Sequence, residues 1–259
     1  MKYILMFILN CLFLTAEAQN FSGFHVGIEF GKSQMTGEID ERWEFRQTVD
    51  SYTSYEGYDG FENAIGEGAI QYVGLKTTYS IWKDRLTFGS GLRYVHIHEQ
   101  VFPGESTPYL YLYHPSNEGI EFFRLHGIEE TVGYATIPFE VDMILLGYMS
   151  NWQVYVKGGI QVGMKLHTKN ELDFVVQEMR KYENSILSTR NVTQNNLFST
   201  LNGSLGLRLI LENGTRLAIE GTSSSIFLTK NNLSLLTSQS LPGVHFTLSV
   251  PIHQFSIHQ

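Results

Sequence analysis

The most constraining feature of this chain is a strict two-residue alternation, seen most cleanly over residues 152–167. One set of alternate positions is apolar and includes Trp152, Val156 and Ile160. The other set carries lysine, glutamine, glycine and, at its end, His167. A β-strand sends alternate side chains to opposite faces, so one face here suits hydrocarbon and the other suits water or charge. Strands of this kind form the walls of outer-membrane barrels, with the apolar face outward.

Other stretches alternate in the same way and give eight expected strands in all. These strands are 22–33, 70–81, 85–96, 133–146, 152–167, 201–211, 216–222 and 243–250. Pro138 falls inside one of them, and a bulge or an irregular pairing is expected there because proline cannot donate to a ladder. After the N-terminal segment no apolar run approaches the length of a spanning helix, and the mean hydropathy is −0.11. A membrane protein with this hydropathy has to expose its apolar residues one by one, on strands.

The connections between these strands alternate between long and short. The long segments are 34–67, 98–131, 168–196 and 223–241, and the short turns include the hairpin signal Asn213-Gly214. Outer-membrane barrels have an even strand number, short periplasmic turns and long outside loops. We therefore predict an all-β fold, an eight-stranded antiparallel up-and-down transmembrane β-barrel with long extracellular loops and short periplasmic turns.

The N-terminal segment predicts export. Lys2 precedes an apolar run, and Ala16-Glu17-Ala18 fits the small-x-small pattern of a signal-peptide cleavage site. The run is shorter than the roughly 20 residues that a spanning helix needs. A lipidated Cys11 is an alternative, less favoured because the apolar run continues past it. The predicted organisation is a signal peptide at 1–18 and one outer-membrane β-barrel domain at 19–259.

Composition narrows the classes of function. Cys11 is the only cysteine, so the mature chain would have no disulfide and no thiolate metal site. The formal net charge of −8 argues against nucleic-acid binding. We expect no cofactor and no nucleic-acid partner. The expected partners are outer-membrane lipid and, beyond lipid, other envelope proteins.

The inward face of the predicted strands is charged. Its charged residues are Glu29, Lys76, Arg93, Glu140, Asp142, Lys157, Lys165, Arg208 and Glu220. An eight-stranded barrel is just wide enough for side chains to fill, and glycines on the same face leave room for long ones. An unpaired buried charge would cost several kcal/mol. We favour a salt-bridged plug that stiffens the barrel over a narrow ion path.

The first long segment is acidic and aromatic. Its acids are Glu38, Asp40, Glu41, Glu44, Asp50, Glu56, Asp59 and Glu62, and its aromatic residues are Trp43, Tyr52, Tyr55, Tyr58 and Phe61. The spacing in 50–60 does not match a Ca²⁺ loop, whose ligands sit at fixed positions with glycine at the sixth. We therefore favour a solvated loop over a cation site or an aromatic binding surface.

The second and third long segments carry structural signals. Two β-like runs, 109–113 and 120–125, flank a turn cluster and predict an extension of the barrel wall or an extra hairpin. A tyrosine-rich edge of that kind could also recruit a partner strand. The spacing of Leu172, Val175 and Met179 predicts a short amphipathic helix packed on the barrel rim.

Histidines near the predicted loop ends are the candidates for catalysis, namely His96, His98, His114, His126 and His167. Serines and acids lie nearby in sequence, but no spacing matches a nucleophile elbow or an H-E-x-x-H helix. The chain is therefore expected not to be an enzyme, with no catalytic and no metal-binding residues. The residues of a binding site stay unknown at this level.

Two segments carry a resemblance to a known family. Residues 134–141, Tyr-Ala-Thr-Ile-Pro-Phe-Glu-Val, resemble the Y-x-x-I-P strand of the PorT-like outer-membrane β-barrel proteins of Bacteroidetes, and 155–163 resemble the strand that follows. The similarity spans roughly 21–250 through short, structural motifs. It implies an eight-stranded outer-membrane barrel, with a secretion-system role for the namesake and no catalytic residues. Residues 251–259 depart from the pattern of many barrels, which stop on an aromatic residue.

These observations predict an integral outer-membrane barrel with a side-chain-filled interior and a structural or partner-binding role through its extracellular loops. The alternatives are an accessory component of a secretion or transport complex, a rim-located hydrolase, and a soluble lipocalin-like barrel. Orientation separates the last from the first. A membrane barrel places Val156 and Ile160 outside and Lys157 inside, whereas a lipocalin-like barrel reverses them.

Overall fold

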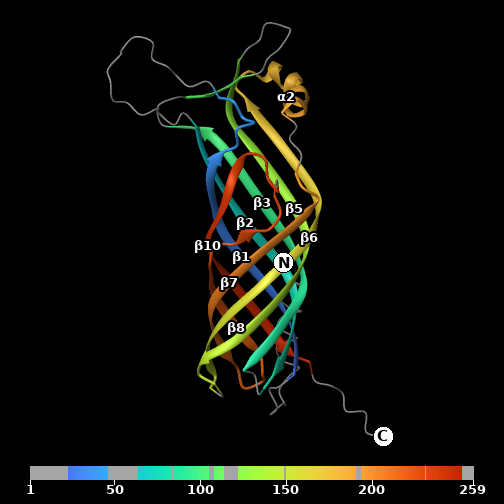
Figure 1. Ribbon diagram of the computed structural model, residues 1–259, viewed down its shortest axis with the longest axis vertical. Helices are drawn as coiled ribbons and strands as arrows, with labels where there is room; N and C mark the ends of the chain where they lie inside the picture. Colours follow the sequence, from blue (N-terminus) through green and yellow to red (C-terminus); the bar gives the residue numbers. More distant parts are fainter. Residues whose placement is uncertain are drawn as a thin grey trace, which may run out of the picture.

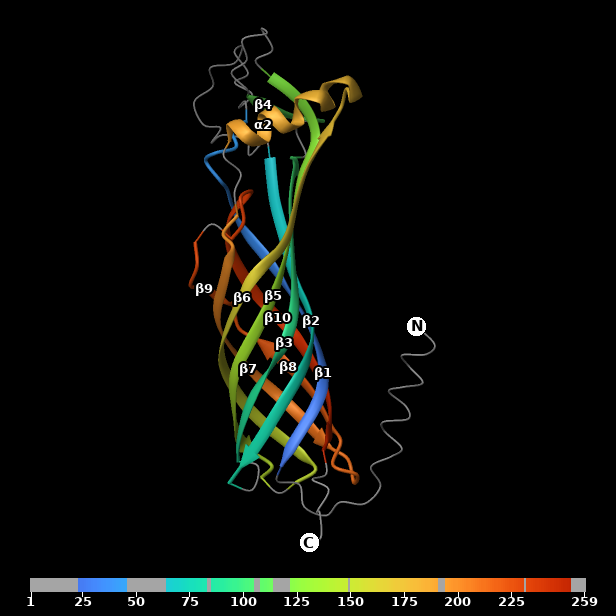
Figure 2. The same cartoon turned by 90° about the vertical axis from the view of Figure 1, so that its right-hand side faces the viewer.

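The computed structural model describes residues 23–45, 64–82, 85–104, 108–113, 122–148, 150–190, 194–230 and 232–252. The predicted signal peptide and Cys11 lie outside these ranges. The described chain forms an elongated barrel with helix α2 at one end (Figures 1 and 2). We call the end with the helix the loop end and the opposite end, where the short connections lie, the turn end.

Strands make up most of the described chain. They are β1 (Phe24–Ile39), β2 (Ala64–Ile81), β3 (Leu86–Pro103), β4 (Leu110–Tyr113), β5 (Phe122–Leu146), β6 (Trp152–Phe174), β7 (Leu197–Ile210), β8 (Arg216–Thr222), β9 (Ile226–Phe227) and β10 (Leu236–Pro251). A 3₁₀ helix η1 (Gln177–Tyr182) continues into the short helix α2 (Glu183–Thr189). No described helix is both long and apolar enough to cross a membrane.

Eight of these strands close into a ring. Antiparallel pairing runs in the order β3, β2, β1, β10, β8, β7, β6, β5, and a β3–β5 ladder closes the cylinder. β4 pairs with β5 outside the ring and β9 pairs with β7. The predicted eight-stranded antiparallel barrel is therefore confirmed. The Asn213-Gly214 turn is also present, with Gly214 at a φ of 79° and Asn213 Oδ1 accepting a hydrogen bond from Thr215 N at 3.0 Å.

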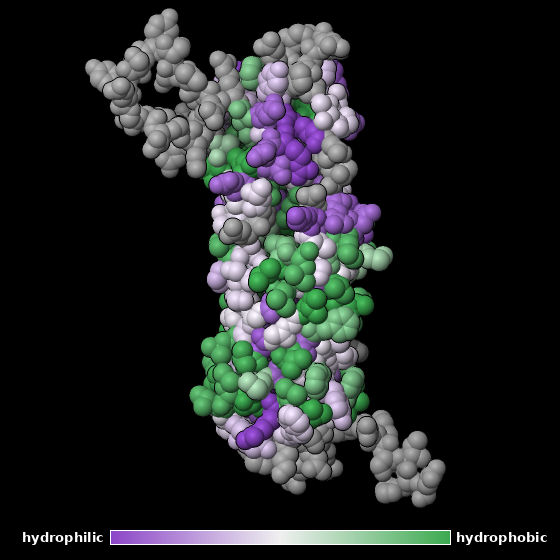
Figure 3. Space-filling view, viewed as in Figure 1, coloured by the Kyte–Doolittle hydropathy of each residue, from purple (hydrophilic) through white to green (hydrophobic). Residues whose placement is uncertain are grey.

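The apolar face of each strand points outward in the half of the barrel nearer the turn end. Val156 and Ile160 are each 38% exposed, while Lys157 between them is 5% exposed. Leu75, Phe139 and Leu205 are exposed in the same way on other strands. Hydrophobic side chains gather around this part of the cylinder and hydrophilic ones gather above it (Figure 3). The lipocalin-like alternative, which needs the opposite orientation, is wrong.

The two faces exchange chemistry partway along the strands, as β3 shows. Leu86, Phe88 and Leu92 point outward near the turn end, whereas Val95 and Ile97 point inward further along. Even-numbered residues of β3 face outward and odd-numbered ones face inward along the whole strand. The apolar residues, however, change from even to odd positions after Tyr94. We place the loop-end boundary of the apolar outer band at this switch. The structure beyond it, with β4, η1 and α2, is called the head.

This exchange corrects the predicted strand ends. The expected loops at 34–67, 98–131, 168–196 and 223–241 begin or end as regular strand, since β1 reaches Ile39, β3 reaches Pro103 and β5 starts at Phe122. The expected strands were defined by apolar residues that keep to one face. This pattern ends at the boundary, so the expected strands end there although the real strands continue. The expected hairpin in the second segment exists as β4 paired with β5 over Leu110–Tyr113.

Three local expectations have particular outcomes. Pro138 causes no register shift, but the β3–β5 pairing skips Ile137 and Pro138, which is the irregular pairing expected. His167 was assigned to the inward face and lies outside, because the register shifts where Gly133 and Tyr134 meet β6 and His167 stacks on the outward Tyr94. The expected helix after residue 170 starts only at Gln177, and Leu172 belongs to β6.

Candidate functional site: the ion-pair layer and the head

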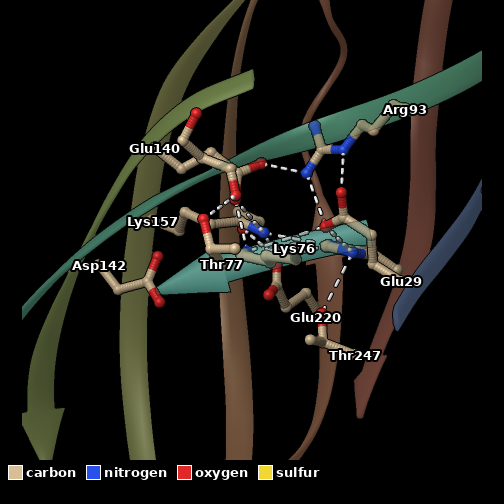
Figure 4. A network of polar contacts seen from close by, with 12 residues as sticks. Glu29, Lys76, Thr77, Arg93, Glu140, Asp142, Lys157, Glu220 and Thr247 are labelled. Atoms are coloured by element: carbon tan, nitrogen blue, oxygen red, sulfur yellow. Dashed lines mark hydrogen bonds and ion pairs between the residues drawn. The ribbon is translucent and has the colours of Figure 1, made fainter. Parts of the chain in front are cut away.

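Inward side chains from seven ring strands meet inside the lumen, and Figure 4 shows six of them labelled, Glu29, Lys76, Arg93, Glu140, Lys157 and Glu220. This ion-pair layer consists of Glu29 (β1), Lys76 (β2), Arg93 (β3), Glu140 (β5), Lys157 (β6), Glu220 (β8) and His245 (β10). Each of them is at most 5% exposed. Alternation places each of these residues on the inner wall, and closure of the ring brings the opposite signs together.

Arg93 is the centre of the layer. Its guanidinium Nη2 donates to Glu29 Oε2 at 2.8 Å while Nε donates to Glu29 Oε1, and Nη2 also reaches Glu140 Oε1. Planar two-pronged contacts of this kind are the strong form of an arginine–carboxylate pair. Gly74 lies between Glu29 and Arg93 in the register. A Cβ there would lie 2.8 Å from Arg93 Cγ, so the glycine leaves the space in which the pair meets.

The remaining members tie the other strands to this centre. Lys76 Nζ lies 2.5 Å from Glu140 Oε2, and Lys157 pairs with Glu220. His245 bridges the two sides, with Nε2 at 3.2 Å from Glu29 and Nδ1 at 3.1 Å from Glu220. The layer therefore connects opposite walls across the lumen, which supports a closed plug over an open path.

Three of the predicted inward charges, Arg208, Asp142 and Lys165, lie apart from this layer. Arg208 pairs with Asp142 at 2.7 Å nearer the turn end. Lys165 is further toward the loop end, where Nζ donates to the backbone oxygen of Gln194 at 2.7 Å. The sequence thus identified the charged inner face, but it did not divide its members into layers.

The head has an apolar interior. Its buried hydrophobic residues form two clusters. One consists of Trp43, Val101, Leu110, Leu112, Phe123, Leu125, Ile128, Leu172, Phe174, Ile186, Leu235 and Leu236. The other, nearer the boundary, consists of Met35, Ile70, Val95, Ile97, Val132, Tyr134, Phe198 and Leu233. Trp43, expected on a solvated loop, is 4% exposed, and its indole Nε1 donates to Ser234 O at 2.8 Å. Arg190 covers the Trp43 ring at 5.5 Å and donates to the backbone oxygens of Arg42 and Tyr113. The head is thus a packed unit that stands beyond the apolar band.

A short buried segment, 232–236, passes through the head interior and is held there by carboxylates. Glu130 Oε2 accepts hydrogen bonds from Ser234 N at 2.8 Å and from Ser234 Oγ at 2.5 Å. Glu99 Oε2 accepts from Leu236 N at 3.2 Å, and Tyr134 donates to Asn232 O at 3.0 Å. We call this segment the strap. The sequence reading missed it, because residues 232–236 carry no alternation and no motif.

The pKa of Glu130 is raised above its ordinary value because burial penalises the carboxylate, although the strap and Gln194 donate to it. The carboxyl group of Glu130 therefore binds its proton more tightly in the folded head than in the unfolded chain. Its contribution to stability is fully present below the unfolded pKa of about 4.5 and is lost as the pH rises through the folded pKa.

We expect Glu130→Gln to reduce this pH dependence. Gln194 can turn its amide so that its oxygen accepts a hydrogen bond from the amide nitrogen of the new side chain. The oxygen of the new side chain can still accept from Ser234. The measurement is protease resistance of the head between pH 4.5 and 8, with wild type losing more resistance than the variant as the pH rises. Parallel curves for the two proteins would contradict the assignment to Glu130.

The other residues singled out from the sequence are dispersed. His96, His98 and His167 lie on the outer wall just past the boundary, and His126 lies on the head surface. His98 Nδ1 is 3.3 Å from Thr131 Oγ1. His114 and the acids at 50, 56, 59 and 62 lie outside the described residues. Within the described ranges, no group of three or more histidine, cysteine or acidic residues is arranged to hold a metal ion.

Four acids of the first segment lie within the described residues, namely Glu38, Asp40, Glu41 and Glu44, and their settings differ. Asp40 pairs with Arg42 at 2.7 Å, and hydrogen bonding from that guanidinium lowers the pKa of Asp40 below its ordinary value. Glu41 is exposed. The ion pair is local, between neighbours in the chain. The prediction of a solvated loop agrees with the exposed Glu41 but is wrong for Trp43, which is buried in the head.

A closed antiparallel barrel with an apolar outer band, a charged lumen and short connections at one end is a β-barrel of the outer-membrane kind. No protein-family model matches the sequence, and no curated protein matches it either.

The search of solved structures finds barrels of distant sequence. The Ail protein of Yersinia pestis is 9% identical with a TM-score of 0.30, covering 89% of this chain and 98% of its own. The translocator domain of the autotransporter NalP from Neisseria meningitidis is 9% identical, with a TM-score of 0.32, and the match covers 96% of this chain and 95% of that domain. The protease OmpT from Escherichia coli is 8% identical, with a TM-score of 0.32, and the match covers 92% of this chain and 100% of OmpT. At these TM-scores the likeness carries no argument about function.

Proposed function

We propose that this chain is a non-enzymatic, integral outer-membrane barrel whose sealed lumen makes it a rigid support for the head, and that the head binds a partner outside the membrane. The single observation that carries the proposal is the exchange of apolar faces along the strands. A chain that only had to span the bilayer would not need an apolar core beyond the band, such as the one around Leu112 and Phe123.

Location is tested by cell fractionation and by a gel run with and without heating. We expect the protein with the outer membrane and a faster band in the unheated sample, because a folded barrel stays compact in detergent. Export through cleavage after Ala18 is part of the proposal, and the mature N-terminus read by mass spectrometry should be Gln19. A soluble periplasmic protein without a heat shift would remove the proposal.

The sealed lumen is tested by recordings in a planar bilayer. We expect no stepwise conductance from the purified barrel, since the ion-pair layer connects opposite walls and its members are almost completely buried. Reproducible single-channel steps from heat-shifting protein would favour the ion path that the charged inner face also allows.

We also propose a more specific version of this function. In it, the chain is related to the PorT-like barrels of Bacteroidetes and acts as an accessory of a secretion or transport complex. The feature that supports it is the projecting head, which offers a surface to other envelope proteins. Purification in mild detergent should then yield a stable complex. A lone monomer would count against the complex while leaving the membrane barrel in place.

A further inference from the structure

The boundary of the apolar band is organised in cross-strand rows. One row consists of directly paired outward residues that are all apolar or aromatic: Phe246, Phe30, Val73, Tyr94, Ala135, Met164 and Leu197. The next row toward the loop end is Val244, Lys32, Gln71, His96, Gly133 and His167. We call these the apolar row and the polar row.

Charge is sorted by sign in the rows that follow. The row after the polar row is Gln34, Ala69, His98, Thr131 and Lys169, which again holds no acid. The acids begin at the next outward row, with Glu67, Gln100, Glu129 and Glu171. In a chain of net charge −8, the two rows next to the apolar band thus carry only neutral and basic side chains. This arrangement complements the phosphates of a lipid leaflet.

The wall is hollowed where the apolar and polar rows cross β10, β1, β2 and β3. A groove of about 490 Å³ lies there, lined on the apolar side by Phe30, Val73 and Phe246 and on the polar side by Lys32 and His96. The Phe30 and Phe246 rings stack at 5.0 Å and form a firm apolar wall. Such a groove can hold acyl chain at one end and an anionic headgroup at the other.

We propose that this groove binds a phosphorylated glycolipid of the outer leaflet. Its acyl chains lie along Phe30 and Val73. Its headgroup phosphate is contacted by Lys32, and His96 lines the same groove on the far side of Gln71. The inference rests on the proposed membrane location and goes beyond it, because ordinary lipid contact requires neither a groove nor sorted charge. Lysine is a suitable phosphate ligand as a compact point charge on a flexible stem.

The test measures glycolipid retained by the heat-shifting barrel after detergent exchange, by mass spectrometry of the intact complex. Lys32→Gln should retain at least about tenfold less, the change expected when one charge-assisted hydrogen bond is lost. Val73→Trp, which fills the apolar part of the groove and keeps the charges, should reduce retention as well. Arg180→Gln on η1 is the matched control, since it removes one exposed positive charge in the head, and it should leave retention unchanged.

Three results would overturn the lipid site while the protein still fractionates with the outer membrane. Retention could stay at the wild-type level in both groove variants. It could fall equally in Arg180→Gln, which would mean that only net charge matters. The retained lipid could also be phospholipid in place of glycolipid. A protein absent from the outer membrane would instead remove the proposed function, and the two failures are therefore distinguishable.

Discussion

Replacing Arg93 with alanine is expected to lower the unfolding free energy of the barrel by about 3–5 kcal/mol, the cost of leaving a buried charge without its partner. The substitution would leave Glu29 without its two-pronged contact and Glu140 with only its lysines, inside a lumen where neither carboxylate is more than 4% exposed. The measurement is the folded fraction across a urea series in detergent or lipid vesicles, scored by the unheated gel shift.

Two further variants make this result specific. Arg85→Ala removes an exposed arginine at the turn end, whose guanidinium lies 4.6 Å from the Tyr148 ring, and it should change stability by less than about 1 kcal/mol. Arg93→Lys keeps the charge but loses the planar fork, so it should fall between wild type and alanine. It also serves if Arg93→Ala does not fold. An Arg93→Ala barrel as stable as wild type would show that the ion-pair layer does not support the wall.

The half of the barrel nearer the turn end could be predicted from the sequence because one rule governs it. From Trp152 to Met164, parity alone says which side chain faces lipid and which faces the lumen. The charged members of the inner face follow from the same rule. Which carboxylate meets Arg93 does not, because that depends on how the ring closes and on the space left by Gly74.

The head could not be predicted in the same way, because in the head the apolar side chains face inward instead of outward. Past Tyr94 the apolar positions face inward. In a strand such as β3 the alternation with a fixed apolar side therefore ends at the boundary, although its pairing continues to Pro103. Trp43 is buried by the strap, a segment 191 residues away in the chain. No local pattern reports a contact of that separation. A change of phase within an otherwise regular alternation is the signal that would have located the head.

Replacing Trp43 with alanine is expected to loosen the head by about 3–5 kcal/mol while the barrel below stays folded. The change removes the largest side chain of the head core together with its hydrogen bond to Ser234 O and the ring beneath Arg190. We expect protease cleavage and fast hydrogen exchange in the head and an unchanged heat shift on the gel. Trp82→Ala is the control, because Trp82 is 72% exposed at the turn end and touches neither the head nor the strap.

The outcome for Trp43→Ala decides how the two halves are coupled. The apolar core of the head and the ion-pair layer are separate clusters, one held by packing and the other by charge. Local opening therefore requires only that the strands beyond the boundary lose their inner packing, while the ladders within the band stay paired. If Trp43→Ala abolished the heat shift as well, the head and the barrel would be one cooperative unit, and the view of the barrel as an independent support would be wrong.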